Sequence, residues 1–124
     1  MIDALKAFLE EKGYTGISTD NMPAEAAAPE AIGLFCWSHT VADINDGSGT
    51  FLIQIQVRQK TRQAAKAICD ELFVLLDSGL DEDPIQLTEN KWCIARPRRG
   101  AVILDRTALT TTYYCEIALW GENQ

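Results

Sequence analysis

The sequence predicts an α+β fold with a mostly antiparallel sheet and two helices packed on one face. Residues 51–58 place apolar side chains at every second position and mostly polar ones between them, which is the period of a half-buried strand. Residues 61–78 repeat apolar side chains every three or four positions, which is the period of a helix with one buried face. Because the strand and the helix follow each other directly, we expect the helix to cover the apolar face of the strand.

The N-terminal segment predicts a helix, a weak strand and a loop. Residues 3–12 carry apolar side chains at helical spacing, and Gly13 ends this helix. Residues 14–19 suit a short edge strand. Residues 20–30 contain two prolines and three consecutive alanines, which predicts a loop. Since Met22 is its one apolar anchor, we expect this loop to be mobile.

A β-hairpin follows the loop. Residues 32–42 are rich in aromatic and β-prone side chains, and residues 43–49 are turn formers that lead into the strand at 51–58. We expect the outer face of this second strand to meet water or a partner. Its inner face consists of Phe51, Ile53, Ile55 and Val57, and its outer face of Leu52, Gln54, Gln56 and Arg58.

The second helix is the strongest in the sequence. Thr61 can cap its first turn, and Gly79 supplies a left-handed stop. Its apolar stripe consists of Ala65, Ile68, Leu72, Leu75 and Leu76, widened by Cys69 and Phe73.

The C-terminal third predicts strands. After a short segment at 85–88, residues 91–97 form a strand that Pro97 breaks, and residues 97–107 form a connection rich in arginine. Residues 109–120 form the long last strand. One face of that strand consists of Leu109, Thr111, Tyr113, Cys115, Ile117 and Leu119, and the other includes Tyr114, Glu116, Ala118 and Trp120.

Composition excludes several classes of protein. The 124 residues suffice for a single domain, residues 1–124, whose core needs no metal or disulfide. The net charge of −7 disfavours binding to nucleic acid, because phosphate contacts need clustered Lys and Arg. No apolar run is long enough to span a membrane, and the N-terminus does not suggest a signal peptide.

We expect no catalytic, cofactor-binding or metal-binding residues, and therefore no enzyme. His39 is the single histidine and has no marked catalytic partner. A calcium loop beginning at Asp43 fails, because its twelfth position is Gln54 where a glutamate is required. The four cysteines form no Cys-x-x-Cys pair, so we expect reduced thiols that contribute to packing. They are Cys36, Cys69, Cys93 and Cys115.

Charge and aromatic side chains indicate a candidate subunit interface. Residues 70–90 carry seven acids and no base, whereas residues 91–106 carry five bases and one acid. In a heterologous contact such segments can meet between copies, with Arg98 and Arg99 opposite the acidic loop of the neighbour. Trp120 is either an interface anchor or a half-covered surface residue. The candidate interface residues are Asp81, Glu82, Asp83, Arg98, Arg99, Trp120, Gln54, Gln56 and Arg58.

The strand at 51–58, followed at once by a helix of the form A-A-x-x-I-x-x-x-L-x-x-L-L at 64–76, resembles phage tail terminator proteins. These proteins are also described as minor capsid or tail-completion proteins. The N-terminal helix, the start of the first long strand at 32–35, the connection at 97–105 and the final strand add to the likeness, which covers nearly the whole chain.

The resemblance implies a virion assembly protein without catalytic activity. Such proteins form a ring, commonly a homohexamer, at the head-proximal end of the tail tube. The ring stops tube growth and performs head–tail joining. The implied partners are further copies of the chain, the tail tube protein and the head–neck connector protein. DNA passes through the ring without being bound, and no membrane is involved. Assembly would occur in the bacterial cytoplasm, from a phage or a prophage.

Two other classes stay open at this stage. The first is a small dimeric ligand-binding or regulatory α+β module that uses the exposed sheet face as a pocket wall. The second is a small enzyme that depends on a cysteine or a carboxylate. The molecular mass in solution separates a ring from a dimer.

Overall fold

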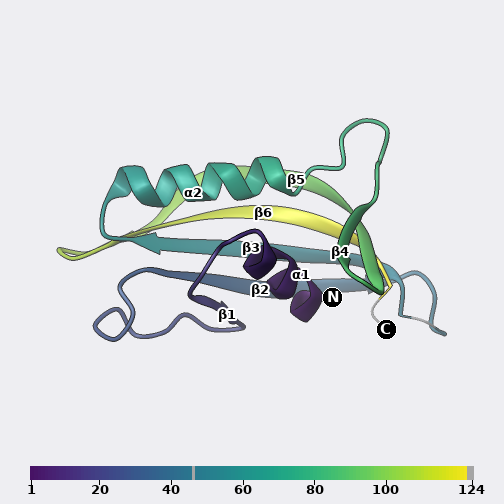
Figure 1. Cartoon of the computed structure of the whole chain (residues 1–124), viewed down its shortest axis with the longest axis horizontal. Helices are drawn as coiled ribbons and strands as arrows, with labels where there is room; N and C mark the ends of the chain where they lie inside the picture. The colour runs from purple at the N-terminus through teal and green to yellow at the C-terminus, as the bar shows by residue number, and fades with distance from the viewer. Residues whose placement is uncertain (46, 123–124) are drawn as a thin grey trace.

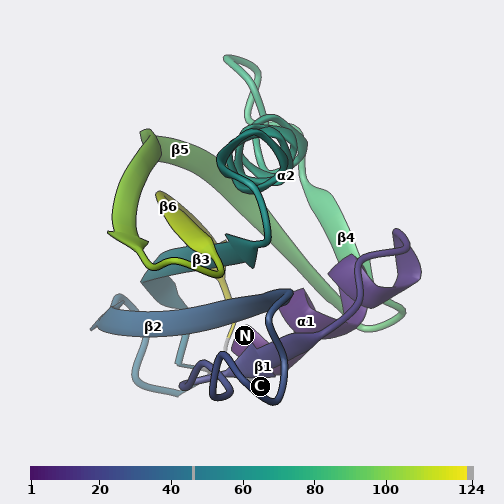
Figure 2. The same ribbon diagram turned by 90° about the vertical axis from the view of Figure 1, so that its left-hand side faces the viewer.

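Two helices lie on one face of a curled six-stranded sheet in the computed structural model, which describes residues 1–45 and 47–122 (Figures 1 and 2). Along the chain the elements are α1 (Ile2–Glu11), β1 (Ile17–Thr19), β2 (Ala31–Val41), β3 (Gly49–Gln59), α2 (Arg62–Leu75), β4 (Ile85–Thr88), β5 (Lys91–Arg106) and β6 (Thr111–Gly121). The order β1-β2-β3-β6-β5-β4 makes β3 and β6 the central strands. Asp46, within the predicted turn between β2 and β3, lies outside the described residues.

The sheet is mixed, so the expectation of a mostly antiparallel sheet is wrong. β1 runs parallel to β2, with Ile17 beside Ile32 and Thr19 beside Leu34. The loop at 20–30 carries the chain from the end of β1 back to the start of β2, and such a return connection gives both strands one direction. The remaining neighbouring pairs are antiparallel. The α+β class describes this arrangement of two helices and one sheet.

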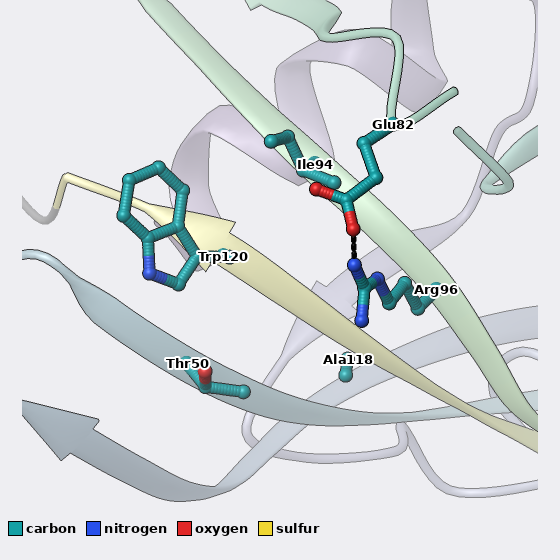
Figure 3. Close-up of a pocket in the computed structure, with 6 residues that line it drawn as sticks. All are labelled: Thr50, Glu82, Ile94, Arg96, Ala118 and Trp120. Carbon is teal, nitrogen blue, oxygen red and sulfur yellow. Dashed lines mark ion pairs between the residues drawn. The ribbon is translucent and has the colours of Figure 1, made fainter. Parts of the chain in front are cut away.

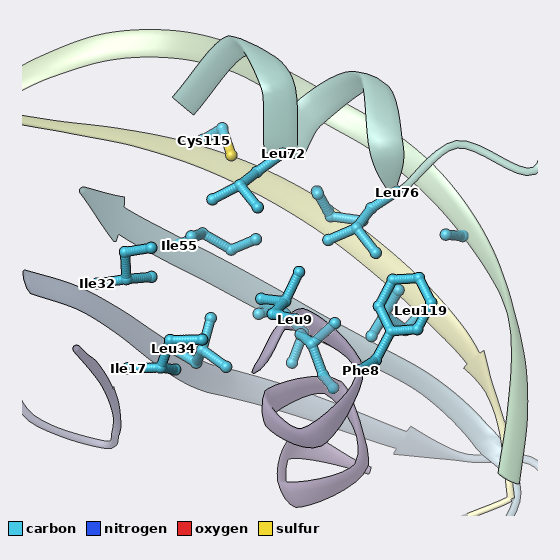
Figure 4. Close-up of a cluster of buried hydrophobic side chains, with 14 of the residues drawn as sticks. Phe8, Leu9, Ile17, Ile32, Leu34, Ile55, Leu72, Leu76, Cys115 and Leu119 are labelled. Atoms are coloured by element: carbon cyan, nitrogen blue, oxygen red, sulfur yellow. The ribbon is translucent and has the colours of Figure 1, made fainter. Parts of the chain in front are cut away.

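The apolar face predicted for β3 is buried under α2, as expected (Figure 4). Leu72 and Leu76 descend from the helical side toward the central strands that carry Ile55 and Leu119 (Figure 4). All four side chains are fully buried. α1 packs on β1, β2 and β4, on the same face of the sheet. It adds Leu5, Phe8 and Leu9 to one continuous core.

The predicted start of α2 is confirmed. The Thr61 hydroxyl oxygen accepts a hydrogen bond from the backbone N–H of Ala64 at 3.1 Å, which satisfies a donor that the first helical turn leaves free. The helix ends at Leu75, somewhat earlier than predicted. Gly79 has the expected left-handed conformation, with φ +75°, but lies in the turn beyond the helix.

β5 continues through Pro97, contrary to the prediction of a broken strand. Ala95 makes two hydrogen bonds to Ser78, both at 2.8 Å: the Ala95 N–H donates to the Ser78 hydroxyl, and the Ala95 carbonyl accepts from the Ser78 N–H. The backbone polar groups of Ala95 therefore point away from β6. Two residues later Pro97 faces the same side. β4 pairs with β5 no further than Cys93 among the described residues, so the N–H that proline lacks costs no ladder hydrogen bond.

β6 begins at Thr111, so Leu109 does not belong to the last strand as predicted. Leu109 lies in the turn between β5 and β6 and is 66% exposed. The hydroxyl oxygen of Thr107 accepts hydrogen bonds from the N–H groups of Leu109 and Thr110, both at 3.1 Å. This local capture of backbone donors competes with strand pairing and shapes the turn.

Replacement of Leu72 by alanine tests the packing of α2. We expect Leu72→Ala to lower the free energy of unfolding by about 2–5 kcal/mol, because the side chain is fully buried. Val74→Ala is the matched control on the same helix, since Val74 is 74% exposed, and should change stability by less than about 0.5 kcal/mol. Urea denaturation followed by circular dichroism measures both. Equal effects would contradict the assigned buried face.

Candidate functional site

The face of the sheet opposite the helices, here called the outer face, brings several predicted interface residues together. In the register of β3 and β6, Gln54 lies beside Glu116, Gln56 beside Tyr114, and Thr50 beside Trp120. Gln56 also donates a side-chain hydrogen bond to Gln54 at 2.8 Å. The sequence therefore placed Gln54, Gln56 and Trp120 correctly on one face.

Trp120 forms part of a pocket at one end of the outer face (Figure 3). Its side chain is 40% exposed, and its ring centroid lies 5.8 Å from that of Trp92 in a tilted arrangement. Ile94 lies beside Trp120 in the register of β5 and β6. The pocket has a volume of about 420 Å³. We name it the Trp120 pocket; it is lined by Thr50, Glu82, Ile94, Arg96, Ala118 and Trp120.

An ion pair between Glu82 and Arg96 forms one wall of the Trp120 pocket (Figure 3). Glu82 belongs to the turn between α2 and β4 and has a left-handed φ of 54°. Both side chains are exposed, so the ion pair contributes little to stability. It does mean that Glu82, a predicted interface residue, pairs with an arginine of its own chain. Asp81 and Asp83 are exposed on either side of Glu82.

The predicted basic residues lie in the middle of β5. Arg98 and Arg99 are both exposed. Arg99 donates a hydrogen bond to the Tyr114 hydroxyl at 3.3 Å and lies beside Glu116 in the register, which places it on the outer face. Arg96 was not among the residues expected at an interface. The sequence feature that could have identified Arg96 is the alternation of β5, which places Trp92, Ile94 and Arg96 on one side of the strand.

Arg58, also predicted at the interface, is used inside the chain and is only 8% exposed. Its guanidinium donates to the backbone carbonyls of Pro23, Ala28 and Pro29 at 2.5–3.3 Å. The loop at 20–30, which we expected to be mobile, is thus held on the outer face. Arg58 and the carbonyl groups that it binds lie far apart in the sequence, so no local sequence pattern predicts these hydrogen bonds.

A second attachment joins the loop at 20–30 to the turn between β5 and β6. One carboxylate oxygen of Glu25 accepts hydrogen bonds from the hydroxyls of Thr107 and Thr110, at 2.8 and 2.5 Å. These hydrogen bonds, the one from Thr110 most strongly, lower the pKa of Glu25. This second attachment of the loop is therefore stronger when Glu25 is ionised.

The residues considered for chemistry have structural partners. His39 stacks on Phe51, with ring centroids 3.9 Å apart, and its Nε2 atom lies 3.0 Å from the Gly47 carbonyl oxygen. Cys69, Cys93 and Cys115 are buried, and all four cysteines are free thiols. Residues 1–45 and 47–122 contain no group of three or more His, Cys, Asp or Glu side chains that could hold a metal. No helix within these residues is long and apolar enough to cross a bilayer.

Comparison with known proteins gives a fold match. A solved structure superimposes with a TM-score of 0.55 over 100% of this chain and 97% of the other, with 14% sequence identity. This likeness shows the fold alone. No protein-family model matches the chain, and no curated protein matches it in sequence.

Thiol reactivity tests the buried state of the cysteines. Burial raises the pKa of Cys93 to about 12, and a hydrogen bond with Cys69 together with burial raises the pKa of Cys115. We expect a thiol reagent at about pH 8 to modify the half-buried Cys36 first and the buried thiols only after unfolding, because the thiolate is the reactive form. Spectrophotometric counting of thiols with and without denaturant measures this. Rapid reaction of all four in the folded protein would contradict it.

The pH dependence of stability tests the Glu25 attachment. Because the folded-state pKa of Glu25 is lowered from 4.5, its contribution to stability is present above that value and is lost as the pH falls through the folded-state pKa. We expect Glu25→Gln to show a smaller fall in melting temperature than the parent between about pH 5 and pH 3. The exposed Glu30→Gln is the control. Parallel melting curves for parent and Glu25→Gln would rule out this role.

Proposed function

We propose that this chain is a structural virion assembly protein of the tail terminator type that functions as a ring of identical subunits. The observation that carries the proposal is the separation of opposite charges on one chain. Asp81 and Asp83 are exposed in the turn between α2 and β4, and Arg98 and Arg99 are exposed along β5. Two different surfaces that complement each other make a heterologous contact, which closes into a ring when the rotation permits.

In this proposal the ring, of six subunits, caps the head-proximal end of a phage tail tube. It stops growth of the tube and joins it to the head–neck connector. The net charge of −7 supports passage of DNA through the ring without binding, because like charges repel. The protein acts without catalysis, cofactor or membrane, and it is assembled in the bacterial cytoplasm before it becomes part of the virion.

Molecular mass in solution and electron microscopy test this function. We expect sedimentation to give a mass near six protomers, and negative-stain images to show rings with a central channel. Co-expression with the tail tube protein of the same genome should yield tubes that carry the ring at one end. A protein that stays monomeric at high concentration would contradict the proposal.

A second candidate function is a dimeric ligand-binding or regulatory module. The Trp120 pocket favours it, because a volume of about 420 Å³ lies in the range of small-molecule sites. A dimer whose melting temperature rises with a metabolite would support this function and not the ring, since binding to the folded state raises stability by mass action.

Charge reversal tests the contact between neighbouring subunits. We expect the double variant Arg98→Glu and Arg99→Glu to weaken the ring while each subunit stays folded. Adding Asp81→Lys and Asp83→Lys should partly restore it, and Glu82 is left unchanged because it pairs with Arg96. Each exposed pair contributes about 0.2–1 kcal/mol, so assembly should also weaken in high salt.

Sedimentation at low and high salt measures these variants, with circular dichroism to confirm folding. Lys6→Glu, on α1, with Lys12→Glu, directly after α1, changes the net charge by the same amount and is the matched control. A ring that tolerates the first variant as well as the control, or a second variant without rescue, would exclude this pairing.

A further inference from the structure

The hairpin of β5 and β6 ends in an exposed apolar arm, which we define as Val102, Ile103, Leu104 and Leu109. These side chains are 38%, 46%, 46% and 66% exposed. Successive residues of a strand point to opposite faces, so the arm has partly exposed apolar side chains on both faces. The arm forms one end of the long axis of the molecule (Figure 1, left). Adjacent exposed apolar side chains of this kind mark an association site.

The Trp120 pocket lies toward the opposite end of the same sheet. Ile94 of the pocket and Val102 of the arm are eight residues apart on β5, which corresponds to about 26 Å of strand. Because a paired strand separates them, the arm cannot reach the pocket of its own chain. The turn between α2 and β4, which carries Glu82 of the pocket wall, projects at the end away from the arm (Figure 1).

We propose that the apolar arm of one copy inserts into the Trp120 pocket of the next copy. The occupant is a second copy because the arm and the pocket of this chain complement each other in charge and in shape. Arg99 precedes the arm, and Arg106 lies on it beside its single acid, Asp105, whereas Asp81 and Asp83 flank the pocket wall. The apolar floor of the pocket, Ile94 with Ala118 and Trp120, receives aliphatic side chains (Figure 3).

This inference rests on the proposed ring and names the apolar part of its repeated contact. A protrusion at one end and a receptor at the other give a head-to-tail contact, which uses one arm and one pocket per interface. The pairing of Arg98 and Arg99 with the acidic turn fits the same contact, since only Gly100 and Ala101 separate these arginines from the arm on β5.

Two variants that each disable one half of the contact test the proposal. The arm variant combines Ile103→Asp with Leu104→Asp, and the pocket variant, Ala118→Trp, fills the pocket. We expect each alone to sediment as one protomer under conditions in which the parent forms the ring. Val74→Asp places a charge at an exposed apolar position on α2 and is the matched control, which should assemble as the parent does. Circular dichroism confirms that each variant is folded.

Mixing the two variants gives the decisive measurement. The arm variant keeps an intact pocket and the pocket variant keeps an intact arm, so an equimolar mixture should form a dimer of one copy of each. A mixture that stays monomeric while both variants are folded would overturn the proposal, as would a ring formed by either variant alone. In the second case the ring function survives through other contacts, whereas a monomeric parent protein overturns both the ring and the arm.

Discussion

The burial of the α2 stripe against β3 and β6 is the contact on which the rest of the structure depends. Leu72 and Leu76 are fully buried against the inner faces of these central strands. β3 and β6 pair along eleven residues each, so the helix and two strands form a block to which both sheet edges attach. Since apolar burial is the main favourable term in folding, the positions of β1, β2, β4 and α1 follow from this block.

Both helices lie on one face, so only the loop at 20–30 is held on the other face of the sheet among the described residues. The two-residue period of the central strands then determines what that face presents: each buried side chain of β6 has an outward neighbour, among them Trp120, Ala118 and Glu116. The Trp120 pocket is a direct product of this alternation in β5 and β6. Fold and surface are therefore encoded by the same stretches of sequence.

Local periodicity predicted the parts of the fold whose partners are near in sequence. The β2–β3 hairpin, the Thr61 cap and the inner face of β3 were all correctly anticipated, and so was the position of Trp120 on the outer face. Three features were not anticipated, because each depends on residues distant in the sequence: the parallel direction of β1, the passage of β5 through Pro97 and the burial of Arg58. Ser78 binds the backbone of Ala95, two residues before Pro97, and carbonyl oxygens about thirty residues away hold the Arg58 guanidinium.

The free edge of β5 beyond its pairing with β4 is irregular, and this affects whether other strands can pair with it. Its register with β6 shifts after Pro97, after Arg99 and after Ile103, and such bulges twist a strand away from a flat template. A long strand edge with regular geometry is a template on which strands of other chains can pair, which promotes aggregation into fibres. Proline, bulges and arginines along β5 disfavour that backbone pairing. In the ring that we propose, copies would therefore join through side chains, which suits a closed assembly rather than a fibre.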